Sequence, residues 1–225
     1  MTPLIPLAVA FAALGLWLGL RLVRESRARN LARAGFFDAV KPLFDSAEVQ
    51  LQPTGFPRMT GRSNGLAFDL QAVPDTLTFR KLPALWVMVS LPEPMPVGAT
   101  LDVMARPSGL EPFSRFANLP QTLPRPSFLP ETVVVRSDNA ALVAPERLIA
   151  RLAAIFANAR IKEFVISPKG LRIVFLTEEA DRGRYLIFRD AEMGMTPLSP
   201  SHVAPLLDTL GSMRQDLLDW SKEPG

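Results

Sequence analysis

The hydrophobic pattern begins with one long apolar run. Residues 4–20 read LIPLAVAFAALGLWLGL and carry no charge, and the apolar character resumes for two residues after Arg21. A stretch of about 20 apolar residues matches the length of a helix that spans a bilayer core. Trp17 lies near the charged end of the run, where an amphipathic ring suits the membrane interface. We therefore predict a transmembrane anchor at residues 1–23.

Two other interpretations of this run are weaker. A cleaved signal peptide has basic residues before its apolar core and a small-x-small cleavage site behind it. This run has neither of these features. A buried core helix is the second alternative, but the run is apolar on all sides and is followed directly by a basic cluster.

Behind the run the pattern becomes that of an amphipathic helix. Apolar residues recur at three-residue steps from Leu31 to Val40, which predicts one apolar helix face. Pro42 then ends or bends this helix, because proline lacks the backbone N–H that a helix interior needs. We assign residues 24–46 to a juxtamembrane helix.

Residues 47–106 form a first, β-rich half. Residues 66–73 alternate apolar and polar side chains, as a half-buried strand does. Asn64-Gly65 directly before them predicts a hairpin, because both central residues of such a turn adopt positive φ. Residues 85–91 are continuously apolar and predict a buried central strand, and residues 100–105 predict another.

Residues 107–130 are a connection rich in proline and phenylalanine. A long connection without regular structure is often functional, so Phe113, Phe116 and Phe128 are candidates for contact with a protein partner. The alternative is a strap that packs these aromatic rings onto the protein's own core. A disordered linker rarely carries so many aromatic residues.

Residues 131–225 form a second α+β half. The pattern predicts strands at 132–136, 163–167, 171–176 and 184–189, and helices at 145–159 and 199–217. The overall prediction is an α+β fold in which a transmembrane helix precedes a mostly antiparallel sheet with two or three packing helices. The segments SNGLAFDL and PKGLRIVFL resemble each other, which indicates either an α-β-β-β unit used twice or a chance likeness between hairpins.

The charge distribution argues against nucleic-acid binding. The chain has a formal net charge of +3 and a pI near 9.7. Residues 1–34 hold five arginines and one glutamate, a net of +4, so the remaining residues carry a net of −1. Such a near-neutral surface lacks the basic face that phosphate backbones require.

The basic cluster instead predicts contact with lipid headgroups and an orientation. Positive charge collects on the cytoplasmic side of membrane segments, which places the soluble domain in the cytoplasm, at a membrane of the bacterial inner-membrane type. Basic side chains next to a membrane also attract anionic headgroups. The predicted headgroup contacts are Trp17, Arg21, Arg24, Arg27, Arg29 and Arg33.

The sequence contains no motif that predicts catalysis, a metal or a cofactor. Cysteine is absent, which excludes disulfides and Cys-ligated metals. The only histidine, His202, falls in the first turn of a predicted helix, where exposure is the ordinary state. Arg182 and Arg184 flank Gly183 and are candidates for anion contact, with a solvated hairpin turn as the alternative.

These observations favour a non-catalytic accessory, assembly or scaffold factor that acts through protein–protein contacts at a membrane. Its predicted partners are membrane lipids and other membrane proteins. Gly15 and Gly19 have the spacing of closely packed membrane helices, which predicts a homodimer through them. A tethered domain that binds a small molecule or lipid, and a membrane enzyme that uses carboxylates and arginines, remain the alternatives.

Overall fold

The computed structural model describes residues 4–76, 82–183, 185 and 192–223. The fold is α+β, with a nine-stranded sheet in which every described strand pairing is antiparallel. The first four strands form a meander that begins at one edge of the sheet. They are β1 (Ser46–Leu51), β2 (Pro57–Ser63), β3 (Leu66–Asp75) and β4 (Ala84–Leu91).

The remaining five strands do not follow the order of the chain. The next strand in sequence lies three positions away from β4, because two strands from the second half fill the space between them. The sheet order after β4 is β9 (Gly170–Glu179), β8 (Ile161–Ser167), β5 (Leu101–Ala105), β7 (Val133–Ser137) and β6 (Gln121–Leu123).

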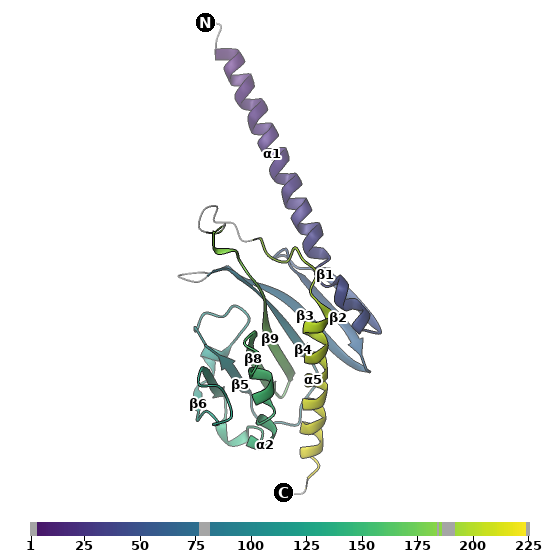
Figure 1. Cartoon of the computed structure of the whole chain (residues 1–225), viewed down its shortest axis with the longest axis vertical. Helices are drawn as coiled ribbons and strands as arrows, with labels where there is room; N and C mark the ends of the chain where they lie inside the picture. The colour runs from purple at the N-terminus through teal and green to yellow at the C-terminus, as the bar shows by residue number, and fades with distance from the viewer. Residues whose placement is uncertain (1–3, 77–81, 184, 186–191, 224–225) are drawn as a thin grey trace.

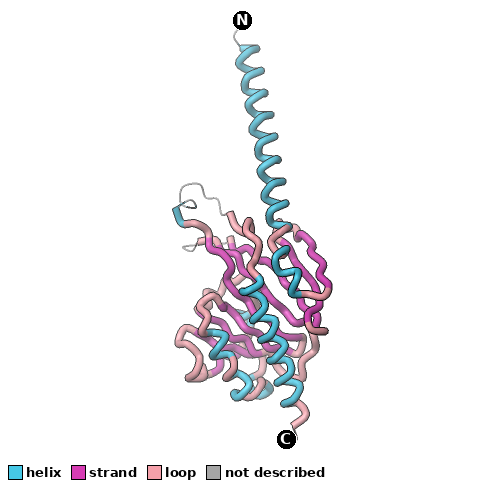
Figure 2. The backbone as a smooth tube through the Cα atoms, turned by 45° about the vertical axis from the view of Figure 1, so that its right-hand side comes forward, coloured by secondary structure: helices cyan, strands magenta, loops and turns pink. Residues whose placement is uncertain are grey.

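Helix α5 (Pro200–Trp220) covers one face of this sheet (Figures 1 and 2). Its start follows from the sequence, because the Ser199 side chain accepts a hydrogen bond from the Ser201 N–H and Pro200 takes the first helical position. The helix predicted at 199–217 is present, and it buries one apolar face against the sheet. Its buried residues are Val203, Leu206, Leu207, Leu210, Met213 and Leu217.

The N-terminal helix α1 (Leu4–Ala34) projects from the sheet domain as a long rod (Figure 1). Directly behind it, Phe36 and Phe37 enter the core, where both are almost fully buried, and a short 3-10 helix, η1 (Asp38–Leu43), leads to β1. The predicted juxtamembrane helix is therefore the last part of α1 followed by η1, and β1 already begins at the end of the predicted range.

The prediction of a transmembrane anchor in residues 1–23 needs correction. Among the residues that the structure describes, no helix has both the length and the apolar character that crossing a membrane requires. Charge limits the apolar length of α1, because Arg21, Arg24 and Glu25 all lie within this helix.

Other predicted elements differ in detail from the structure. The helix predicted at 145–159 is divided into two short helices, α2 (Glu146–Ile149) and α3 (Leu152–Phe156). The edge strands β1 and β6 were not predicted as strands. The strand predicted at 184–189 lies, apart from Tyr185, outside the described residues.

The tight turn between β8 and β9 depends on Gly170. Its φ of 140° is in the region that favours glycine, and a Cβ placed there would lie 2.3 Å from the Leu91 carbonyl oxygen. The Ser167 hydroxyl donates to the Gly170 carbonyl at 3.0 Å and closes the turn. The turn can thus come this close to the end of β4 only without a side chain.

We expect Gly170→Ala to reduce the free energy of unfolding by about 3 kcal/mol, because backbone strain and a steric clash add together. Gly65→Ala is the matched control, since Gly65 also has a positive φ of 76° but open space around its Cβ position. It should cost only about 1 kcal/mol. Urea unfolding at neutral pH measures both, and equal losses would contradict the role given to close approach.

Candidate functional site

The projecting part of α1 exposes large apolar side chains on all of its sides. Nine such residues between Val9 and Val23 are 45–66% exposed. The Trp17 ring lies under the Arg21 guanidinium, with 5.6 Å between the charged carbon and the ring centre. The described part of α1 therefore presents an uncovered apolar surface that ends in an aromatic–cationic pair, the residue types found at membrane interfaces.

The structure divides the predicted headgroup contacts into two groups. Arg24 and Arg27 are exposed on α1, and Arg21 pairs with Glu25 at 2.9 Å on the same helix. Arg33 instead anchors the helix to the body: its Nε donates to the Met193 carbonyl at 3.2 Å, and its guanidinium lies 4.2 Å from the centre of the Phe56 ring. Arg29, which is half-buried, lies between these groups.

The other predicted contact residues are not brought together. Arg182 is exposed, and Arg184 lies outside the described residues. Phe113 and Phe116 are buried, 8% and 5% exposed, and Phe128 packs half-buried against the core. The aromatic side chains of the connection therefore pack as a strap on the body, and in this state they offer a partner little surface.

A polar row crosses the sheet on the face opposite α5. Successive residues of a strand point to opposite faces, so residues paired across neighbouring strands share a face. The register places the following residues in one row from β3 to β6: Asp69, Ser90, Arg172, Val165, Asp102, Arg136 and Thr122.

Asp102 of this row and Glu163, two residues along β8 from Val165 on the same face, form a buried pair of carboxyl groups that the sequence did not predict. Asp102 on β5 is 2% exposed and Glu163 on β8 is fully buried. The two side chains are hydrogen-bonded to each other, and Arg172 Nη2 donates to Glu163 Oε2 at 2.8 Å. Asp102 Oδ1 and Arg172 Nε are buried without a hydrogen-bond partner. Two acids thus share one cation.

This arrangement makes Asp102 the protonated member of the pair. Burial, and then the nearby Glu163 carboxylate, raise the pKa of Asp102 to about 8, because both disfavour its charged form. Burial also raises the pKa of Glu163, although Arg172 and the hydrogen bonds to Glu163 oppose that effect. One proton is therefore held between the two carboxyl groups at neutral pH.

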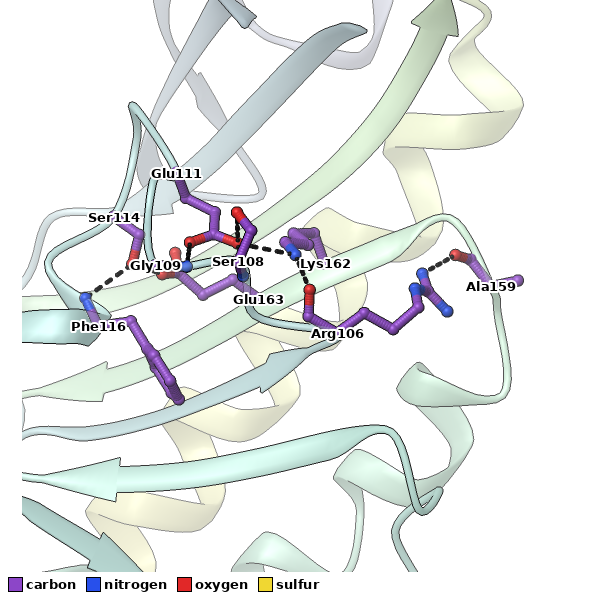
Figure 3. Close-up of polar contacts among 9 residues, drawn as sticks. All are labelled: Arg106, Ser108, Gly109, Glu111, Ser114, Phe116, Ala159, Lys162 and Glu163. Atoms are coloured by element: carbon purple, nitrogen blue, oxygen red, sulfur yellow. Dashed lines mark hydrogen bonds and ion pairs between the residues drawn. The ribbon is translucent and has the colours of Figure 1, made fainter. Parts of the chain in front are cut away.

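The connection passes over Glu163, one member of the carboxyl pair, and is bonded to it (Figure 3). The Ser114 hydroxyl donates to Glu163 Oε1, and the same oxygen of Ser114 accepts the Phe116 N–H at 3.0 Å. We call residues 107–120, which carry these contacts, the strap.

A second ion pair holds the beginning of the strap (Figure 3). Lys162 Nζ lies 3.0 Å from Glu111 Oε1 and donates to the Arg106 carbonyl at 2.6 Å. Burial opposes ionisation of Glu111, but hydrogen bonds from Ser108 and from Lys162 outweigh burial and lower the pKa of Glu111 to about 2. This pair is therefore ionised at neutral pH.

The cluster holds charge and one proton. Among the described residues, no group of three or more acidic or histidine side chains is arranged to hold a metal ion. A hollow of about 670 Å³ lies elsewhere, lined by residues of β1 to β3 and by Pro92. His202, the remaining titratable candidate from the sequence, is exposed on α5.

The sequence did contain a signal for the carboxyl pair. Asp102 interrupts the apolar strand LDVMA, and Glu163 precedes the apolar run FVIS, so both acids occupy strands that are otherwise buried. Comparison with known proteins adds no functional residue: no protein-family model matches the chain, and no curated protein has significant similarity to it.

We expect the shared proton to make stability depend on pH. A carboxyl with a raised pKa keeps a proton in the folded chain that the unfolded chain has lost. The free energy of unfolding should therefore fall from about pH 5 to about pH 8, by up to about 1.4 kcal/mol per pH unit, and then level off. Urea unfolding across this range measures the slope.

The variant Asp102→Asn identifies the source of this slope. An asparagine has the shape of the neutral acid and cannot ionise, so the slope between pH 5 and 8 should become shallower by about 1 kcal/mol per unit. The control Glu48→Gln removes an exposed carboxyl of β1 and should leave the slope unchanged. An unaltered slope in Asp102→Asn would assign it to other groups.

Proposed function

We propose that this protein is held at a membrane by the apolar part of α1 and acts there as a non-catalytic accessory, assembly or scaffold factor. The observation that carries the proposal is the uncovered apolar surface between Val9 and Val23. Exposed patches of this size on soluble proteins are uncommon and mark interaction sites.

The energetics support a lipid environment for this segment. Burying one large apolar side chain gains about 1.5–3 kcal/mol, so nine half-exposed side chains forgo on the order of 10 kcal/mol in water. The segment is apolar around its whole circumference, whereas a helix that docks on one protein surface needs only one apolar stripe. Lipid offers an apolar environment to such a segment without requiring a matching protein groove.

The arginines support an orientation at that membrane. Arg24 and Arg27 follow the apolar segment directly and are exposed, where they can reach anionic headgroups. We propose that the sheet domain lies on the cytoplasmic side of a membrane of the bacterial inner-membrane type, because basic residues are retained on that side.

The non-catalytic part of the proposal rests on where the reactive groups lie. Asp102 and Glu163, the acids with raised pKa values among the described residues, are buried beneath the strap, and neither lines the hollow over β1 to β3. Acids and bases that act on a substrate need contact with it. Action through protein contacts fits such a body better than catalysis does.

Dimerisation through Gly15 and Gly19 stays a prediction. A Cβ at either position would meet no atom of the chain within 4 Å, so this side of the helix is open to a second copy. Close approach of two helices at a pair of small residues four apart would use that space.

Flotation of the purified full chain with lipid vesicles tests membrane attachment. The triple variant Leu14→Ser, Leu16→Ser, Leu18→Ser should remain in the bottom fractions, whereas the wild type floats, because its apolar transfer free energy is lost. The matched control, Leu51→Ser, Leu110→Ser, Leu142→Ser, changes three exposed leucines of the sheet domain and should float like the wild type. Flotation of both variants would refute attachment through α1.

A second arm of this experiment examines the arginines. We expect Arg24→Gln combined with Arg27→Gln to weaken binding to vesicles with anionic lipid by roughly tenfold or more, since each basic residue contributes about 1 kcal/mol. Binding to purely zwitterionic vesicles should be unaffected. A reporter that is fused to the C-terminus and is active only outside the cytoplasm tests the orientation. Reporter activity would place the sheet domain on the side opposite to the one proposed.

A further inference from the structure

The strap is attached to the sheet almost entirely through side chains. Residues 108–119 donate three backbone–backbone hydrogen bonds, and all three end within the strap, on the carbonyls of Glu111, Arg115 and Phe116. A segment in a sheet or helix would share its backbone bonds with its neighbours. The strap therefore has no backbone ladder that would keep it in place if its side-chain contacts weakened.

The contacts that do hold the strap involve three charged residues of the sheet. Lys162 binds Glu111, Glu163 accepts from Ser114, and Arg136 Nη1 donates to the carbonyls of Phe116 and Ala117 at 3.2 and 3.1 Å. Apolar contacts complete the attachment, with the Phe113 ring 5.3 Å from that of Trp86. Charge on the sheet therefore decides how firmly the strap is held.

The start of the strap has a backbone suited to a bend. Arg106 has a φ of 49°, unusual for a residue other than glycine, and Gly109 has a φ of 79°. The Arg106 N–H donates to the Thr132 carbonyl at 2.7 Å, which fixes the point from which the strap leaves the sheet. Movement of the strap would turn about these residues.

Among the groups that hold the strap, the carboxyl pair beneath it is the one whose charge changes with pH near neutrality. The charged groups that face Asp102 are Glu163 on β8, Arg172 on β9 and Glu111 on the strap. Arg136 on β7 is the residue paired with Asp102 across the sheet, and Lys162 is bound to Glu111. If Asp102 ionises, two carboxylates share the single guanidinium of Arg172. An unpartnered buried carboxylate oxygen then needs water, and the strap is what covers it.

We propose that the strap is a hinged cover latched by the proton that Asp102 and Glu163 share. With the proton in place the cover is closed and Phe113 and Phe116 are buried. Loss of the proton admits water to the pair, breaks the Ser114–Glu163 bond and exposes the two rings. The direction follows from the raised pKa of Asp102: the cover is closed at acidic and neutral pH and loosens as pH rises through about 8.

Amide hydrogen exchange of the full chain tests this cover. Exchange of peptides from residues 107–120 is compared at pH 7 and pH 9 after correction for the intrinsic rates. We expect their protection to fall by about tenfold in the wild type, because the ionised fraction of Asp102 rises from about a tenth at one pH unit below its pKa to about nine tenths at one unit above it. Peptides from β4 and β9 should remain far more strongly protected than the strap at both pH values, and their protection should fall only as far as the free energy of unfolding does. A strap as strongly protected as these peptides, or one whose protection does not change with pH, would overturn the proposal.

Two variants separate the latch from general loosening. Asp102→Asn cannot ionise, so its strap should have the same protection at both pH values. Ser114→Ala removes one bond to Glu163 and leaves the pair intact, so its strap should exchange faster at pH 7. The control Asp69→Asn removes a carboxyl from the same polar row that pairs with Arg58, and it should behave as the wild type. Wild-type behaviour of Asp102→Asn would overturn the proposal, and if that variant does not fold, the wild-type comparison of strap and sheet peptides decides.

Discussion

The pairing of β4 with β9 joins what would otherwise be two separate sheets. Each strand lies at the inner end of its own group, β1 to β4 on one side and the strands of the second half on the other. The register from Leu91↔Leu171 to Ala84↔Glu179 brings the apolar sides of both groups under the same helix, α5. The Gly170 turn lies at the end of this pairing, so the close approach there is part of the same contact.

This continuous sheet also places acidic side chains in a buried, electrostatically unfavourable position. A sheet with one helix-covered face can leave the other face polar and wet, as β1 to β3 do. Over β5, β8 and β9 that polar face is covered, and its acids lose their water. The protein resolves the conflict by protonating one acid, by aligning Arg172 with the other, and by bonding Ser114 of the covering segment to the pair.

Local signals in the sequence predicted the elements, and non-local pairing explains most of what was missed. The cap at Ser199 and the turn at Asn64-Gly65 predicted α5 and the β2–β3 hairpin, because such signals act over a few residues. The edge strand β6 is three residues long, too short to show a pattern, whereas β1 does alternate polar and apolar residues over SAEVQL and was still not predicted. The likeness of the β2–β3 and β8–β9 hairpins leaves duplication of an α-β-β-β unit as a prediction. Asp102 and Glu163 are far apart in sequence, so only the sheet order reveals that they meet.

The joint between α1 and the sheet domain couples the two mechanically. Arg33 is fixed to the Met193 carbonyl and the Phe56 ring, Phe36 accepts the Leu198 N–H at 2.8 Å, and Phe37 is buried. The domain therefore turns whenever the helix turns about its own axis. Since an α-helix has 3.6 residues per turn, one residue more or less before this joint would swing the strap-bearing face by about 100° relative to whatever holds the apolar segment. The length of α1 thus sets the orientation of the strap-bearing face about the helix axis.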